Sequence, residues 1–426
     1  MKYCEFLEPL TEVAQWGLAR NRVRFGPRRG DKSRDMGGRR GDVRSFAGGD
    51  DINNSTHPIP QFFQCFSRSR HVRNKLPPVS KRPTFISNTF KVPQKIALEE
   101  AISTTVFNST ATLPPAPRTG ELPYVNTDYA ADVKNRLGNI DARVKAMDEA
   151  GIALTVVSLT MPGIEGIFDA STAVEMAKKV NDEIHSIYTA GPHARRFRAF
   201  GCVPMQDPKA AALEAERCIK ELGFVGILVN GYSNIGGADT VQYLDEPQCE
   251  PFWAKLEELD VPLYIHPRIP PPSQMRVYKG YEFLAGSPWG FGVETAMHAI
   301  RLMVSGLFDR HPSLKILLGH CGEGIPFSLH RIDHRIRHFQ TQHFQCKLRL
   351  QQYWDKNFWT TTAGVKSDSA FTETLRVCGE DRLMWSVDYP YEDYDELGQW
   401  FDSMELSEST QAKIGWENAR RLLKLD

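Results

Sequence analysis

From residue 94 to the C-terminus, short apolar runs alternate with longer amphipathic stretches. Eight runs have the length and the β-branched and aromatic content of strands; they span residues 94–101, 153–159, 196–204, 223–231, 261–267, 314–320, 358–364 and 382–390. Residues 138–151, 208–223, 294–306 and 411–425 carry apolar side chains every three to four positions, the helical period. This alternation predicts a (β/α)8 TIM barrel over residues 91–426. A doubly wound open sheet is disfavoured, because no G-x-G-x-x-G turn follows the first strand.

Residues 1–90 have neither period and are rich in Arg, Gly, Ser and Pro. They hold 17 Lys/Arg against 8 Asp/Glu, whereas the whole chain has a net charge of zero. This composition predicts a disordered basic extension. Three acidic residues near the start (Glu5, Glu8 and Glu12) argue against a mitochondrial transit peptide. No aromatic interleaving supports nucleic-acid binding, so a solvated, dispensable extension is the favoured interpretation.

The rest of the composition is that of an ordinary globular protein, with 41% hydrophobic and 24% charged residues. The 8 cysteines form no C-x-x-C pair, which favours free thiols in a reducing compartment and hence the cytoplasm. No apolar run approaches the roughly 20 residues needed to span a bilayer, so we expect no membrane partner.

The first predicted strand, within "KIALEEAIST", ends on two adjacent carboxylates, Glu99 and Glu100. Neighbours on a strand point to opposite faces, so only one of the two can face the barrel interior. Three other predicted strands also end on an ionisable group, namely His266, His320 and Asp388. In a barrel of this type, catalytic groups lie at the carboxyl ends of the strands. Carboxylates and an imidazole there form a candidate divalent metal site, with Glu99 facing inward and Glu100 toward the helices.

Each of these residues also has a purely structural interpretation. His266 precedes a proline and could simply end a strand, and Asp388 could cap a turn. His330, His334 and His338 recur every four residues among arginines, which is more typical of a solvated helix face than of a metal site. Cys321 lacks an obvious base partner and is expected to pack. A catalytic site is favoured because four predicted strands, rather than one, end on an ionisable residue.

In this order, "ALEEA", "LYIHPR", "LLGHCGEGIPF", "HRIDHR" and "SVDYPYE" resemble the metal-dependent aromatic decarboxylases of the amidohydrolase superfamily. That group includes the 2,6-dihydroxybenzoate (γ-resorcylate), 2,3-dihydroxybenzoate and salicylate decarboxylases. The resemblance runs from about residue 94 to the C-terminus and excludes the basic extension. It implies non-oxidative loss of CO2 from an ortho-hydroxybenzoate.

Residue by residue, the resemblance implies that Glu99, His266 and Asp388 hold one divalent metal. Zinc is the expected ion, with magnesium or manganese as alternatives, and no organic cofactor is expected. His320 and Glu323 match a catalytic pair beside the metal, and Arg331 matches the arginine that receives the substrate carboxylate. A homodimer or homotetramer is implied as well.

One position departs from the family pattern. Many relatives carry Glu-x-His after the first strand, where this chain has Ala101. The missing ligand fits the 2,3-dihydroxybenzoate or salicylate branch better than the γ-resorcylate branch. Two rival functions stay open: a single-metal hydrolase of a lactone or amide, and a barrel that serves only for binding. The fourth strand ends at Asn230 without a lysine, which disfavours a two-metal hydrolase.

The expected mechanism divides the work among these side chains. Asp388, with a raised pKa, would protonate the ring carbon that loses CO2. His320, oriented by Glu323, would hold or deprotonate the ortho hydroxyl, and Arg331 would hold the carboxylate. Trp289, Phe291 and Tyr391 could stack on the ring, although core packing is an equally good interpretation of each. The reaction should run backwards at high bicarbonate.

Overall fold

Eight parallel strands form one sheet in chain order, as the alternating pattern predicts. In this computed structural model the residues described are 95–109, 125–339 and 341–425. The strands follow the order β1 (Lys95–Ile102), β2 (Ile152–Leu159), β3 (Phe197–Gly201), β4 (Gly226–Asn230), β7 (Pro262–His266), β8 (Lys315–Leu318), β9 (Phe358–Thr361) and β10 (Leu383–Met384). A short ribbon of β5 (Ser233–Asn234) and β6 (Val241–Gln242) is separate from it. Residues 1–90, for which a disordered basic extension was predicted, lie outside the described part of the chain.

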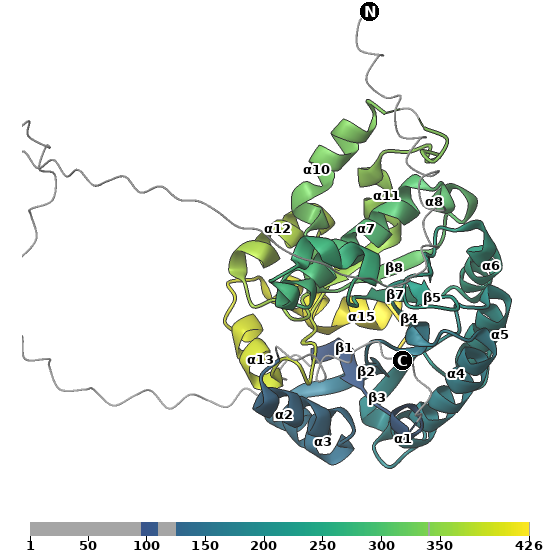
Figure 1. The fold of residues 1–426 in the computed structure, drawn as a ribbon. Coiled ribbons are helices and arrows are strands. Elements are labelled where there is room, and N and C mark those ends of the chain that lie inside the picture. Colours follow the sequence, from purple (N-terminus) through teal and green to yellow (C-terminus); the bar gives the residue numbers. More distant parts are fainter. Residues whose placement is uncertain (1–94, 110–124, 340, 426) are drawn as a thin grey trace, which may run out of the picture. The chain divides into compact units, whose positions relative to one another are not determined.

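Helices surround the strands on the outside of the barrel (Figure 1). The α-helices are α1 (Thr105–Ser109), α2 (Thr127–Leu137), α3 (Ile140–Glu149), α4 (Ala170–Ile184), α5 (Pro208–Lys220), α6 (Glu250–Leu259), α7 (Gly290–Val304), α8 (Leu307–Arg310), α9 (His320–Glu323), α10 (Ile325–Ile336), α11 (Leu350–Asn357), α12 (Asp368–Cys378), α13 (Tyr394–Asp402), α14 (Glu408–Ala412) and α15 (Asn418–Leu422). None of the helices in the described residues is long and apolar enough to cross a membrane. The cysteines that the structure describes are all free.

Side-chain caps fix where several helices begin. The Asp207 carboxylate accepts hydrogen bonds from the backbone N–H groups of Lys209 and Ala210, and Pro208 occupies the first turn of α5. Asp169 caps α4 in the same way. Both the carboxylate cap and the N-terminal proline satisfy or remove donors that a helix start leaves unpaired. The helices are therefore set by local sequence, and their apolar faces dock on the sheet.

The two faces of the strands bury two different apolar clusters. The barrel interior is filled by residues from alternate strand positions and is closed below by the C-terminal segment: Ile96, Leu98, Val156, Phe200, Leu228, Tyr264, Leu317, Met384, Ala419, Leu422, Leu423 and Leu425. The larger cluster lies between the strands and the surrounding helices and includes Ala97, Ile102 and Val157. The polar strand ends stand above the first cluster, at the barrel mouth.

A β-bulge in β1 decides which of its two carboxylates faces inward. Ala97 pairs with Thr155 and Glu100 pairs with Val157, so β1 advances by one residue more than β2 between these pairs. Leu98 therefore faces the interior together with Glu99, and Glu100 faces the helices. Without the bulge, alternation from Ile96 and Leu98 would turn Glu100 inward instead. Glu99 was predicted to face inward and Glu100 outward, and both orientations are found.

The contact between β1 and the segment after β10 closes the barrel and is called the seam here. Many of the hydrogen bonds across the seam involve side chains. The Ser386 hydroxyl accepts the N–H groups of Leu98 at 3.0 Å and of Glu99 at 2.8 Å, which holds the bulge. The Glu100 carboxylate accepts the N–H groups of Val387 at 3.2 Å and of Tyr389 at 3.0 Å. Glu100 thus serves the seam, so the two adjacent carboxylates have different tasks.

Two predicted elements differ from the observed ones. The run 382–390 was predicted as a strand, but only Leu383–Met384 is one, because the N–H groups of Ser386 and Val387 donate to the side chains of Thr362 and Glu100 rather than to a ladder. The helix predicted over 411–425 is divided into α14 and α15 by a π-turn at Lys413–Glu417. Both differences lie beside the seam.

Candidate metal centre and active site

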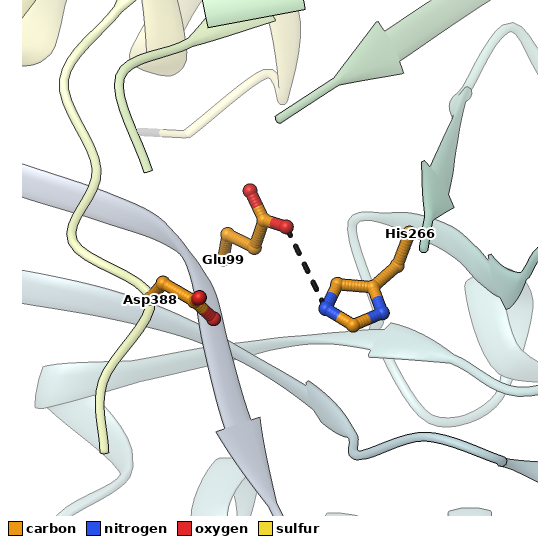
Figure 2. Close-up of side chains that lie close together, drawn as sticks. All are labelled: Glu99, His266 and Asp388. Carbon is orange, nitrogen blue, oxygen red and sulfur yellow. Dashed lines mark ion pairs between the residues drawn. The ribbon is translucent and has the colours of Figure 1, made fainter. Parts of the chain in front are cut away.

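Glu99, His266 and Asp388 converge at the barrel mouth from β1, from the end of β7 and from the segment after β10. Figure 2 shows the three side chains pointing toward one another. One ligand atom from each lies within 4.8 Å of the others, and the Oε1 atom of Glu99 is 3.6 Å from Nε2 of His266. The structure therefore brings together the three residues that the sequence nominated as metal ligands.

The chemistry of these three atoms fits a divalent cation. Oε1 of Glu99 and Oδ1 of Asp388 are buried oxygens without a hydrogen-bond partner. Burial raises the pKa of Glu99 to about 8, and the nearby His320 opposes this only in part. Burial likewise raises the pKa of Asp388. Two buried carboxylates are costly together unless a cation compensates them, and a bound cation supplies that compensation.

His266 has the protonation state that a ligand needs. Burial, followed by the charge of His320, lowers the pKa of His266 to about 3. The imidazole is therefore neutral at physiological pH, with a lone pair available for a metal. Two carboxylate oxygens and one imidazole nitrogen leave further coordination positions open toward the cavity.

His320 and Glu323 form a pair immediately beside these ligands. Nδ1 of His320 is 2.7 Å from Oε1 of Glu323, while Nε2 is 3.7 Å from Oδ2 of Asp388. Burial disfavours a charged ring, but Glu323 and Glu99 together raise the pKa of His320 well above its usual value. A histidine in this setting can hold a proton at Nε2, facing the cavity, while Glu323 fixes the other nitrogen.

The pair is carried by an unusual left-handed turn. The five residues from His320 to Gly324 all have positive φ: His320 48°, Cys321 55°, Gly322 78°, Glu323 56° and Gly324 73°. Left-handed backbone costs roughly 1–2 kcal/mol for each residue that is not glycine. Such strain persists where the surroundings enforce it, and it is concentrated at functional sites. Asp388, with φ of 80°, shares this conformation.

A cavity of about 840 Å³ opens above the ligands and is mainly apolar in its walls. His266, His320, Glu323 and Asp388 line its base. The three aromatic residues expected to contact a substrate, Trp289, Phe291 and Tyr391, all line it. Its volume suits a ligand of one aromatic ring with room to spare.

Arg331 is placed differently from the other predicted residues. It lies on α10 and is exposed, whereas Ser328 and Ile332 of the same helix line the cavity. Within the described chain, the structure does not bring Arg331 to the cavity wall. Its assignment as the carboxylate-binding residue stays a prediction.

Tyr264 is a site residue that the sequence interpretation missed. It lies on β7 two positions before His266, and its hydroxyl donates a hydrogen bond to Oε2 of Glu99. The period of two along a strand could have pointed to it, because residues 264 and 266 share the interior face. Tyr129, whose hydroxyl is 3.1 Å from the carbonyl oxygen of Tyr391, also lines the cavity and was not predicted.

Comparisons with known proteins agree with this geometry. Residues 110–425 match the family described as Amidohydrolase. The γ-resorcylate decarboxylase of Polaromonas sp. (strain JS666 / ATCC BAA-500) is 43% identical over 336 residues, which cover 78% of this chain and 99% of that protein.

Two solved structures have the same fold. One is a dihydroxybenzoic acid decarboxylase from Polaromonas sp. JS666 with bound manganese and the inhibitor 2-nitroresorcinol; it has 43% identity and a TM-score of 0.72, covering 78% of this chain and 97% of that one. The other is a 5-carboxyvanillate decarboxylase from Novosphingobium aromaticivorans with bound manganese, at 32% identity and a TM-score of 0.71, with the same two coverages of 78% and 97%.

Proposed function

Because this chain belongs to the amidohydrolase family and is a carboxy-lyase of its decarboxylase group, we propose that it removes CO2 from an ortho-hydroxybenzoate. The observation that carries this proposal is the joint placement of two unpaired buried carboxylate oxygens and a neutral imidazole beside the His320–Glu323 pair. His266, His320, Glu323 and Asp388 line one cavity that is large enough for an aromatic ring. A benzoate with an ortho hydroxyl offers two oxygens to such a site.

Glu99, His266 and Asp388 are the proposed ligands of a single divalent cation. Manganese is our first candidate, because two of the three ligand atoms are carboxylate oxygens and because two related structures bind it. Zinc, expected from the family resemblance, and magnesium are the alternatives. When bound, the ion supplies Lewis acidity that favours the phenolate form of the substrate.

Side chains of the protein would then hold the ortho oxygen of the substrate and donate a proton to the ring. His320, oriented by Glu323, keeps a proton on Nε2 and donates a hydrogen bond to the ortho oxygen, which stabilises the phenolate and increases electron density at the ring carbon that carries the carboxylate. Asp388, whose Oδ2 atom lies 3.7 Å from Nε2 of His320, would deliver a proton to that carbon. The carbon–carbon bond then breaks, its electron pair restores the aromatic ring, and CO2 leaves. The apolar walls at Phe291 and Trp289 hold the ring and limit the access of water.

Two observations favour different hydroxybenzoates as the substrate. The similarity to γ-resorcylate decarboxylase favours 2,6-dihydroxybenzoate. Ala101, in place of the histidine of many relatives, favours 2,3-dihydroxybenzoate or salicylate. The three acids share an ortho hydroxyl, and this shared feature is what the proposal requires.

The test is CO2 release by manganese-loaded protein from 2,6-dihydroxybenzoate, 2,3-dihydroxybenzoate, salicylate and 4-hydroxybenzoate. Turnover confined to the first three supports the proposal, and their relative rates identify the branch. Turnover of 4-hydroxybenzoate would contradict a role for the ortho hydroxyl. Inactivity on all four acids, with hydrolysis of a lactone or amide, would replace the decarboxylase by the hydrolase alternative.

We also propose that the protein forms a homodimer or homotetramer. Large apolar side chains are exposed at the start of α7, on α7 and on α10, among them Trp289 (64% exposed), Met297 (54%) and Phe327 (85%). Exposed apolar surface of this kind is typical of association sites. Light scattering coupled to size-exclusion chromatography checks this, and a monomer at micromolar concentration would contradict it.

A further inference from the structure

A fully buried tyrosine lies directly beneath the proposed metal centre. Tyr264 is 0% exposed and belongs to the apolar cluster in the barrel interior, where Phe200 packs beside it with a ring-centroid distance of 5.8 Å. Its ring fills the core, but its hydroxyl points upward to the Glu99 carboxylate. A phenylalanine would fill the same space, so the hydroxyl needs an explanation beyond packing.

The hydroxyl of Tyr264 forms a hydrogen bond with one of the two carboxylate oxygens of Glu99. It donates to Oε2 of Glu99 and lies 2.9 Å from Oγ1 of Thr361, which itself is 3.4 Å from the same Oε2. The opposite oxygen, Oε1, has no hydrogen-bond partner and faces Nε2 of His266 at 3.6 Å. The two oxygens of one carboxylate therefore have different environments, one protein-bound and one directed at the ligand cluster.

The backbone beside Glu99 restricts the carboxylate further. Gly319 lies so close that a Cβ atom at this position would collide with both Glu99 oxygens. The carboxylate is thus held between the Gly319 backbone and the Tyr264 hydroxyl. Rotation that would present both oxygens to a cation would break the bonds to Tyr264 and Thr361 and bring the carboxylate against the backbone.

We propose that Tyr264 is a positioning residue that makes Glu99 a one-oxygen ligand through Oε1, and that this sets which divalent cations the site accepts. Small cations such as Mn²⁺ are satisfied by single oxygens at short distance. Ca²⁺ prefers more oxygens and frequently takes both oxygens of a carboxylate. A carboxylate fixed in this way therefore favours Mn²⁺ over Ca²⁺. The inference rests on the metal site proposed above, but not on the substrate or on the reaction.

The test compares metal affinity in the variants Tyr264→Phe and Phe200→Leu and in the unchanged protein, by competition with a chromogenic chelator. Substitution of residues that orient metal ligands typically weakens metal binding about 10- to 100-fold. We expect this loss for Mn²⁺ in Tyr264→Phe and a smaller loss for Ca²⁺, so that the preference for Mn²⁺ declines. The Phe200→Leu control disturbs the same core layer without touching Glu99, and it should leave the preference unchanged.

Equal losses for Mn²⁺ and Ca²⁺ in Tyr264→Phe would overturn the inference, as would Mn²⁺ affinity within twofold of the unchanged protein. Thr361→Val should shift the preference in the same direction by a smaller amount, since its contact with Oε2 is longer, and it provides a second test if Tyr264→Phe does not fold. Failure of the unchanged protein to bind Mn²⁺ would overturn the metal site and the role of Tyr264 together. Metal binding without turnover of any hydroxybenzoate would overturn the proposed reaction only.

Discussion

Glu99 and Glu100 are consecutive residues of one strand, and both are buried, yet they serve two different regions of the barrel. Glu99 stands at the mouth, where its Oε1 has no hydrogen-bond partner. Glu100 stands on the outer face at the seam, where the N–H groups of Val387 and Tyr389 and the hydroxyl of Ser386 all donate to it. The Glu99 carboxylate therefore has one oxygen without a hydrogen-bond donor, an incomplete set, whereas both oxygens of Glu100 accept hydrogen bonds. An incomplete buried acid is a sign of a ligand site, and a satisfied one is a sign of architecture.

The largest expected effect follows from replacing the incomplete carboxylate. Glu99→Gln keeps the size of the side chain but removes the charge that a cation needs. We expect CO2 release to fall by roughly 10³-fold, which corresponds to about 4 kcal/mol of transition-state stabilisation. The far-UV circular dichroism spectrum should be unchanged. Activity within tenfold of the unchanged protein would mean that Glu99 is not a ligand.

The matched change at the seam, Glu100→Gln, should act on stability instead. The amide cannot accept hydrogen bonds from all three groups that donate to the carboxylate, because its nitrogen is itself a donor. At least one buried donor therefore loses its partner. Such a loss costs about 2 kcal/mol, and we expect the melting temperature to fall by about 3 °C for a domain of this size. Manganese affinity, measured on the folded protein, should stay within about threefold. A stable protein that no longer binds manganese would reverse the assignment of the two residues.

Without metal, both regions should make the stability of the protein depend on pH in the same direction. Burial raises the pKa of Glu99 to about 8 and that of Glu100 to about 7, whereas an unfolded glutamate titrates near 4.3. Between pH of about 6.5 and 8 the metal-free folded protein therefore binds more protons than the unfolded chain, and its stability falls as the pH rises. His266, with its pKa lowered to about 3, is neutral throughout this window.

Manganese should reverse this trend, because it binds the ionised ligands and competes with their protons. Thermal melts from pH 6.5 to 8, with chelator and with manganese, measure the two slopes. We expect a falling melting temperature with chelator and a rising one with manganese. Parallel slopes in the two series would show that the carboxylates at the mouth do not hold the ion.

A combined effect on stability and on metal binding is expected at the residue that connects the two regions. Ser386 accepts the N–H groups of Leu98 and Glu99 at the bulge and donates to Oε1 of Glu100 at 3.1 Å. Ser386→Ala leaves the buried N–H groups of Leu98 and Glu99 without this acceptor, so it should cost at least about 2 kcal/mol of stability. It should also reduce manganese affinity by a few-fold, since the bulge directs Glu99. Chemical denaturation and chelator competition on one preparation measure both effects. A normal affinity with lowered stability would show that the bulge holds Glu99 without Ser386.

The apolar runs of strand length predicted the barrel, and the family resemblance proposed Glu99, His266 and Asp388, which the structure places together. The sequence could not predict the bulge, which depends on a contact with Ser386, nearly three hundred residues away along the chain. It could predict only that one of two adjacent acids faces inward, not why it is the first. The strand expected over 382–390 was too long for the same reason, since Glu100 replaces the ladder there. Long-range polar contacts, unlike hydrophobic period, leave no local pattern.

We propose that Glu99 holds a metal ion while its neighbour Glu100 holds the barrel together. The most direct measurement is the metal content of the unchanged protein, Glu99→Gln and Glu100→Gln after manganese loading and desalting, by inductively coupled plasma mass spectrometry. We predict one ion per chain in the unchanged protein and in Glu100→Gln, and almost none in Glu99→Gln. Equal metal content in the two variants, whether full or absent, would contradict the claim.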